Sequence, residues 1–268
     1  LQVQGALDSQ GHLKALNTTW ALSKEPVTAA LQINRNDERW QLTSPLLKGS
    51  IHIKPKLPWE VVIQRFQWEA APRVSELKQA PLAIDPSHLP ALNIRIEQFL
   101  IGTQGALNLQ AKLRPSASGT TISALKLSNN LYQIEGGGQW TTKQTQVTGT
   151  ADTSKLQQVL ESFALPNFIQ AEQSHLQFAL QWPGAPWQVT FANLNGTLRT
   201  KLSTGSLPDV GSEHSTSLGL GKILNLLSIN SLQEHLSFNF NDISAKGFSF
   251  NSLEGRFELR QGLVKVPK

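Results

Sequence analysis

The stretches LSFNFN (residues 236–241) and FSFNSLEGRFELR (residues 248–260) alternate apolar and polar residues almost without interruption. In the first stretch, Leu236, Phe238 and Phe240 fall on one side, and the serine and asparagines fall on the other. In the second, Phe257 and Leu259 stand against glutamates and arginines. Successive side chains of a β-strand point to opposite faces, so this period of two predicts antiparallel strands with one apolar and one polar face.

Similar segments recur along the chain, separated by Gly, Pro, Asn and Ser. The proline-bearing residues 71–90 predict a long loop or a crossover within one domain, because the strand pattern resumes beyond them. We expect further strands at residues 1–7, 13–22, 28–34, 40–43, 49–53, 61–68, 92–96, 107–113, 122–127, 131–135, 145–151, 176–182, 187–191 and 196–202.

Two segments have the spacing of short amphipathic helices. In residues 154–164, Leu156, Val159, Leu160 and Phe163 recur at helical spacing, and Pro166 prevents continuation. A polar stretch, residues 203–217, precedes the second helix, expected at residues 218–227. The apolar residues of this second helix that we expect to plug or cap a groove are Leu218, Leu220, Ile223, Leu224 and Leu227.

The composition limits the class of protein. A chain of 268 residues suits one large all-β domain or two smaller ones. It contains no Cys, which fits an oxidising compartment such as a bacterial periplasm, and no Met, which predicts a mature or excised fragment. No apolar run approaches the ~18 residues needed to span a bilayer, so we expect any membrane anchor to lie outside this sequence.

Charge and motifs argue against nucleic-acid binding and catalysis. The net charge is +5, but no two Lys or Arg are adjacent, and the aromatics mostly occupy the face opposite the charges. The GLGK stretch at residues 219–222 lacks the upstream Gly and the following Ser or Thr of a phosphate-binding loop. The six histidines are far apart, and the carboxylates are dispersed. We therefore expect no catalytic residues, no metal, no cofactor and no nucleic-acid partner.

Several segments resemble the YhdP family within the AsmA-like superfamily. They are QWPGAPW (residues 181–187), LNGTL (194–198), GKILNLLSI (221–229), LSFNFNDI (236–243), KGFSF (246–250) and LEGRF (253–257). The likeness is stronger over residues 91–268 and weaker over residues 1–90. The extra residues 212–217, and Asn251 where the family often has Asp, depart from the family pattern.

The resemblance implies a mostly β fold, a long curved antiparallel sheet that forms an open apolar groove (β-taco like) with two short helices. It also implies a Gram-negative periplasmic protein, anchored in the inner membrane by parts outside this chain, that carries phospholipid toward the outer membrane. Residues 1–268 would be a single segment of this groove. About seventeen strands at ~4.8 Å each would extend for ~80 Å if the sheet does not close.

The sequence and the resemblance together predict a non-enzymatic lipid conduit whose partners are phospholipid, or another acyl-chain lipid, and membranes. A structural or adhesive β-sandwich module that binds protein partners stays open as an alternative, because the same aromatic residues could fill a closed core. The residues expected to line the groove are Phe178, Leu180, Trp182, Trp187, Val189, Phe191, Phe238, Phe240, Phe248, Phe250, Phe257 and Leu259.

Overall fold

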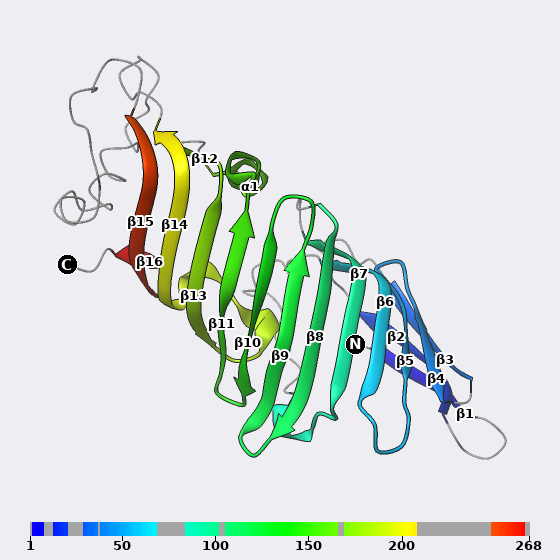
Figure 1. Ribbon diagram of the computed structural model, residues 1–268. Coiled ribbons are helices and arrows are strands. Elements are labelled where there is room, and N and C mark those ends of the chain that lie inside the picture. Colours follow the sequence, from blue (N-terminus) through cyan, green and yellow to red (C-terminus); the bar gives the residue numbers. More distant parts are fainter. Residues whose placement is uncertain are drawn as a thin grey trace. The chain divides into compact units, whose positions relative to one another are not determined.

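Most of the described chain is β-strand (Figure 1). The computed structural model describes residues 2–7, 13–20, 29–36, 38–68, 84–101, 105–165, 169–207 and 248–265. The chain divides into two compact units, Leu1–Asn129 and Asn130–Lys268. The expected helix at residues 218–227, the strand at residues 236–241, Phe238 and Phe240 lie outside the described residues.

Each strand of the first unit pairs with the next one in chain order. No described pairing joins the first strand of this unit to its last, so the sheet is open. The strands expected in this part of the chain are confirmed, with ends that differ by a few residues. They are β1 (Gln2–Leu7), β2 (Leu13–Trp20), β3 (Ala29–Asn36), β4 (Arg39–Thr43), β5 (Leu47–His52), β6 (Trp59–Trp68), β7 (Leu92–Ile101), β8 (Leu107–Ser116) and β9 (Gly119–Ser128).

One pairing of the first unit is parallel, and it explains the proline-bearing segment. Strands β6 and β7 run in the same direction, with Val61 opposite Ile94 and Phe66 opposite Phe99. A parallel pair needs a connection of a dozen or more residues to return the chain to the starting end of the sheet. Residues 69–91 supply that connection, so the expected loop or crossover is a crossover.

The core of the first unit lies on one face of this sheet. Leu42, Ile63 and Ile96 are buried together, and partly buried residues of the neighbouring strands pack against them. The rings of Phe66 and Phe99 stack with centroids 5.5 Å apart. This face is apolar because alternate positions of β4 to β8 carry large aliphatic and aromatic side chains.

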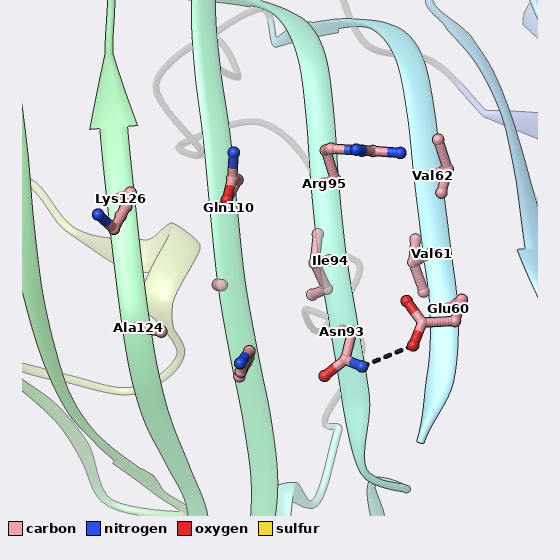
Figure 2. Close-up of a pocket in the computed structure, with 11 residues that line it drawn as sticks. Glu60, Val61, Val62, Asn93, Ile94, Arg95, Gln110, Ala124 and Lys126 are labelled. Carbon is pink, nitrogen blue, oxygen red and sulfur yellow. Dashed lines mark hydrogen bonds between the residues drawn. The ribbon is translucent and has the colours of Figure 1, made fainter. Parts of the chain in front are cut away.

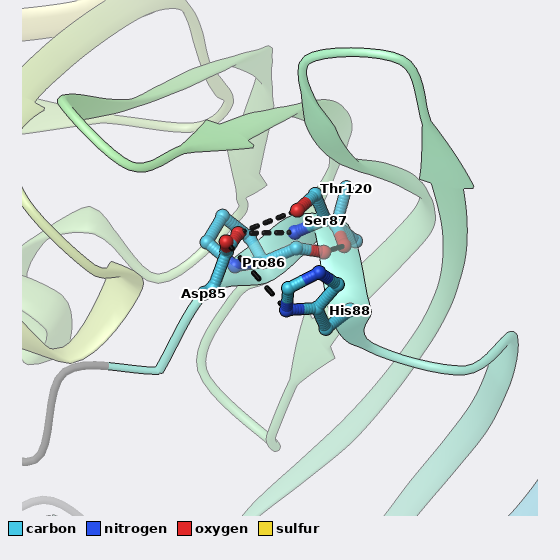
Figure 3. Close-up of polar contacts among 5 residues, drawn as sticks. All are labelled: Asp85, Pro86, Ser87, His88 and Thr120. Carbon is cyan, nitrogen blue, oxygen red and sulfur yellow. Dashed lines mark hydrogen bonds and ion pairs between the residues drawn. The ribbon is translucent and has the colours of Figure 1, made fainter.

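The crossover ends in a short 3-10 helix, η1 (Pro86–His88), that is fixed to β9 (Figure 3). The Thr120 hydroxyl donates to the Pro86 carbonyl at 2.5 Å, and Pro86 is fully buried. Asp85 Oδ1 accepts hydrogen bonds from the Ser87 hydroxyl at 2.7 Å and from the Ser87 amide at 2.9 Å. This N-cap fixes the entry of the chain into β7.

We predict that Asp85 titrates below the ordinary range for aspartate. The Ser87 hydroxyl, then the Ser87 amide, stabilise the charged carboxylate and lower its pKa. Because the pKa is lowered in the folded protein, this stabilisation is present above the ordinary Asp pKa and is lost as pH falls through the lowered value. Carbon-13 NMR titration should show the Asp85 midpoint moving back up in Ser87→Ala and staying in place in Ser123→Ala. An ordinary pKa in the unsubstituted protein would contradict the cap.

The second unit has one sheet with the order β10-β11-β13-β14-β15-β16, and β12 also pairs with β14. All of its described pairings are antiparallel, and none joins β10 to β16, so this sheet is also open. A sandwich needs two packed sheets, and the described strands of each unit form only one. The strands are β10 (Gln133–Thr141), β11 (Gln144–Thr153), β12 (Gln170–Ala171), β13 (Ser174–Pro183), β14 (Asn195–Leu207), β15 (Phe248–Arg260) and β16 (Leu263–Lys265).

The prediction of a strand at residues 187–191 was wrong. The chain there forms two 3-10 helices, η2 (Pro186–Gln188) and η3 (Phe191–Asn193). Proline fits the first position of a helix because it has no N–H to satisfy and its φ is already fixed. The side chains of Gln188 and Asn193 then accept hydrogen bonds from the backbone amides that precede each turn, at 2.7 and 2.9 Å. This local hydrogen bonding prevails over the short apolar alternation of Trp187, Val189 and Phe191.

The helix expected at residues 154–164 is confirmed as α1 (Leu156–Ser162). Its residues Leu156 and Leu160, with Ala171, pack against a buried cluster. The cluster consists of Ile169, Leu202, Phe250 and Leu253. The helix therefore covers the end of the second sheet at which β14 ends and β15 begins (Figure 1). None of the described helices is long and apolar enough to cross a membrane.

Candidate functional site

An apolar surface crosses the strands of the second unit in rows. In one row, Phe178 on β13 lies between Gly149 on β11 and Leu198 on β14, and Leu198 lies opposite Phe257 on β15. Residues directly opposite each other in neighbouring strands point to the same side of a sheet. Phe178 and Phe257, which are 79 residues apart in the sequence, therefore belong to the same surface.

Two further rows extend this surface. Val147, Leu180, Gly196 and Leu259 form the second row. Trp140, Thr145 and Trp182 form the third. We call the side chains on this side of the sheet the second-unit apolar face. Its large members are Trp140, Val147, Leu176, Phe178, Leu180, Trp182, Leu198, Phe257 and Leu259.

Protein covers the second-unit apolar face only in part. Phe178, Leu180 and Leu198 are partly buried, whereas Trp140 and Trp182 are buried at one end of the strands. The described residues of this unit contain no second sheet that could seal the middle of the face. Hydrocarbon side chains that stay accessible across several strands form a surface that another apolar molecule can cover.

The opposite face of the same sheet is polar. Gln177 and Gln181 on β13 and Arg199 on β14 are exposed there. Lys201 and Glu254 form an ion pair at 3.1 Å between β14 and β15. The two faces differ because the polar and apolar residues alternate along each strand, as the sequence predicted.

In the middle of the apolar face, the ring of Phe178 lies close to the backbone of β11 at Gly149. A methyl group placed on Gly149 would lie 2.8 Å from Cζ of Phe178. The ring of Phe178 therefore leans across β11 at a position where only glycine leaves room for it. This packing fixes the ring in the apolar row and leaves it partly accessible.

The connection between β13 and β14 forms one rim of the face. The ring of Trp187 packs edge-on against buried Trp140, with centroids 5.0 Å apart. The Trp182 Nε1 donates to the Ala185 carbonyl at 3.0 Å, and the Thr145 hydroxyl donates to the Gly184 carbonyl at 2.8 Å. At this ordered rim, three large apolar side chains remain exposed: Trp187 at 43%, Val189 at 46% and Phe191 at 64%.

The expected lining residues fall into four groups. Phe178, Leu180, Trp182, Phe257 and Leu259 share the apolar face. Phe250 lies in the buried cluster beneath α1, and Phe248 begins β15. The rim carries Trp187, Val189 and Phe191, while Phe238, Phe240 and the expected plug residues Leu218, Leu220, Ile223, Leu224 and Leu227 lie outside the described part of the chain.

Sequence reasoning left the apolar face of the first unit out of the expected lining. Val61, Ile63 and Phe66 on β6 lie opposite Ile94, Ile96 and Phe99 on β7. The signal was present, because residues 59–68 and 92–101 are the most apolar strands of that unit. The parallel pairing of β6 and β7 brings the two apolar stripes together, and the residue pattern does not predict that pairing.

The polar face of the first unit is hollowed over β6 to β9 (Figure 2). The hollow has a volume of about 460 Å³. Arg95, Gln110 and Lys126 lie in one cross-strand row, and Asn93 Nδ2 donates to Glu60 Oε1 at 2.6 Å. These residues occupy the positions that alternate with the apolar ones, so the hollow belongs to the polar side of the sheet.

The described residues contain no group of three or more His, Cys, Asp or Glu side chains placed to hold a metal ion. Among described side chains with shifted pKa values, Asp85 serves as the cap of η1, and burial raises the pKa of Tyr132. Tyr132 packs against Phe163, with ring centroids 6.2 Å apart. The contacts of Asp85 and Tyr132 thus serve to hold the fold together. The apolar face is therefore the most distinctive chemical surface of the described chain.

The chain is similar in sequence to known proteins. The chain is 28% identical over 179 residues to the intermembrane phospholipid transporter YhdP of Escherichia coli (strain K12). The match covers 65% of this chain and 14% of that relative, so the chain spans a small part of the relative's length. No solved structure matches the chain significantly. The model of the family described as YhdP protein matches residues 11–268. The chain therefore belongs to the YhdP family.

Proposed function

We propose that this chain is a segment of a lipid-transfer conduit that holds the acyl chains of phospholipids against the apolar faces of its sheets. The observation that carries the proposal is the second-unit apolar face. It continues across β10, β11, β13, β14 and β15, and protein covers its middle only in part. The relative's name, intermembrane phospholipid transporter, supports phospholipid as the ligand.

The dimensions and energies of the face suit a single acyl chain. An acyl tail spans about half of the ~30 Å hydrocarbon core of a bilayer, or ~15 Å. Five neighbouring strands spaced ~4.8 Å apart extend for ~19 Å, so one tail fits across them. Each methylene withdrawn from water contributes ~0.8 kcal/mol. A polar side chain pointing inward would cost about as much as one to three methylenes, which explains the continuous alternation.

We further infer the setting in which this segment works. The protein acts without catalysis in the periplasm of a Gram-negative bacterium, anchored to the inner membrane by parts outside this chain, and carries phospholipid toward the outer membrane. The name of the relative and its much greater length support this setting. The absence of Cys from the sequence is compatible with an oxidising compartment. The apolar faces of both units would contribute to the conduit.

Organic extraction of the purified protein, followed by mass spectrometry, tests the proposal. We expect phospholipid to be recovered with protein purified from Gram-negative cells in detergent-free buffer. An acyl chain that left the protein would be exposed to water, so it should stay bound during purification. An unrelated soluble β-protein purified in parallel gives the background. Phospholipid at that background level would refute the proposal.

A further inference from the structure

In the second unit, α1 and β12 lie near the end of β14 and the beginning of β15 (Figure 1). Residues from these four elements and from the turn before α1 line a cavity of about 550 Å³. Polar and apolar atoms contribute about equally to its lining, and the hydroxyl and amide groups come from the ends of these elements. Its apolar lining includes Leu156, Ala171 and Phe250. The cavity thus combines two kinds of lining, and we call its polar residues the polar wall and Leu156, Ala171 and Phe250 the apolar wall.

The apolar wall is continuous with the second-unit apolar face. Leu156, Ala171 and Phe250 pack in the cluster that contains Leu202 and Leu253. Leu202 lies opposite Leu253 and is four residues beyond Leu198 on the same strand, so all three point to the same side of the sheet. A molecule with hydrocarbon on that face could therefore extend a polar end into the cavity.

The polar wall carries one charge of each sign. Lys155 and Glu172 both line the cavity. The Lys155 Nζ donates to the Asn130 carbonyl at 2.9 Å, a neutral acceptor that leaves the positive charge uncompensated. Neither Lys155 nor Glu172 forms an ion pair with a described residue. Gln170 and Asn251 also line the cavity, and their amide groups can donate to phosphate oxygens.

We propose that this cavity binds the headgroup of a zwitterionic phospholipid, with the phosphodiester at Lys155 and the ammonium group at Glu172. This proposal rests on the proposed function, since the acyl chains of the same lipid lie on the apolar face. An anionic glycerol headgroup gains only the contact with Lys155 and leaves Glu172 without a cation. The cavity thereby favours an aminoethyl phosphodiester over a glycerol phosphodiester.

Competition between two lipids with identical acyl chains tests this preference. The purified protein is incubated with vesicles of equal parts phosphatidylethanolamine and phosphatidylglycerol, separated from them, and extracted for mass spectrometry. We expect the recovered ratio to favour phosphatidylethanolamine by about threefold, the size of a solvent-exposed charge pair. Glu172→Gln should bring the ratio back to that of the vesicles, and Glu172→Lys should favour phosphatidylglycerol.

Substitutions outside the cavity serve as matched controls. Glu97→Gln, an exposed carboxylate on β7, and Lys143→Gln, in the turn between β10 and β11, should leave the ratio unchanged. Lys155→Gln should lower the recovery of both phospholipids relative to diacylglycerol with the same acyl chains. Recovery of both lipids in the vesicle ratio by the unsubstituted protein overturns the headgroup site and leaves the proposed function standing. Failure to recover any lipid overturns the proposed function itself.

Discussion

Phe178→Asp should reduce the phospholipid recovered with the protein at least ~10-fold, a loss of ~1.4 kcal/mol in binding free energy. Phe178 lies in the central row of the second-unit apolar face, between Gly149 and Leu198, and is partly accessible. An aspartate there places a carboxylate against the acyl chain, and an unpaired charge that loses water costs more than the hydrocarbon contact returns. Recovery is measured by extraction and mass spectrometry of equal amounts of protein.

The neighbouring position on the same strand provides the control. Ala179 is exposed on the polar face, one residue from Phe178. Ala179→Asp introduces the same charge into the same strand, so it should leave lipid recovery within about twofold of the unsubstituted protein. Far-UV circular dichroism checks that both variants keep their β-sheet. Equal recovery from the two variants would show that the apolar face does not hold the lipid.

Trp140→Ala should lower the free energy of unfolding by ~3–5 kcal/mol, the cost of truncating a fully packed aromatic side chain. Trp140 is 4% exposed and lies beside Thr145, which is completely buried. Removing the ring leaves a cavity beneath the connection between β13 and β14, and it also removes the edge-on contact with Trp187. Urea unfolding followed by far-UV circular dichroism measures the loss without relying on tryptophan fluorescence.

Substitution of Trp187, the ring that packs against Trp140, separates the effect of core packing from that of a contact at the surface. Trp187 is 43% exposed, so Trp187→Ala should cost only ~1 kcal/mol, about the value of an aromatic pair. We also expect the second sheet to stay folded in Trp187→Ala. The rim hydrogen bonds to the Ala185 and Gly184 carbonyls come from Trp182 and Thr145 and do not involve the Trp187 indole. A loss as large as that of Trp140→Ala would mean that the rim, rather than the buried row, stabilises this end of the sheet.

Strand content and the division of faces could be predicted from residue patterns because both are local properties. Period-two alternation in residues 176–182 and 248–260 placed Phe178, Leu180, Phe257 and Leu259 on apolar faces, and the structure places them on one shared face. Helical spacing likewise identified α1, because Leu156 and Leu160 need a common partner surface. The same reasoning failed at residues 187–191, where Pro186 and the side chain of Gln188 favour a 3-10 turn.

The residue pattern alone establishes that this chain is a set of strands with one apolar and one polar side, because side-chain alternation is a consequence of backbone geometry. Which apolar stripes lie next to each other depends on how the strands pair in the folded chain. The fold pairs β6 with β7 in parallel, places Phe178 across Gly149, and brings α1 and β12 to the end of β14. These contacts join residues distant in sequence, and their free energy depends on register and on packing between whole elements. The residue pattern of a single strand specifies neither the register nor the packing between elements. The open apolar surface and the cavity beside it are therefore properties of the assembled sheet.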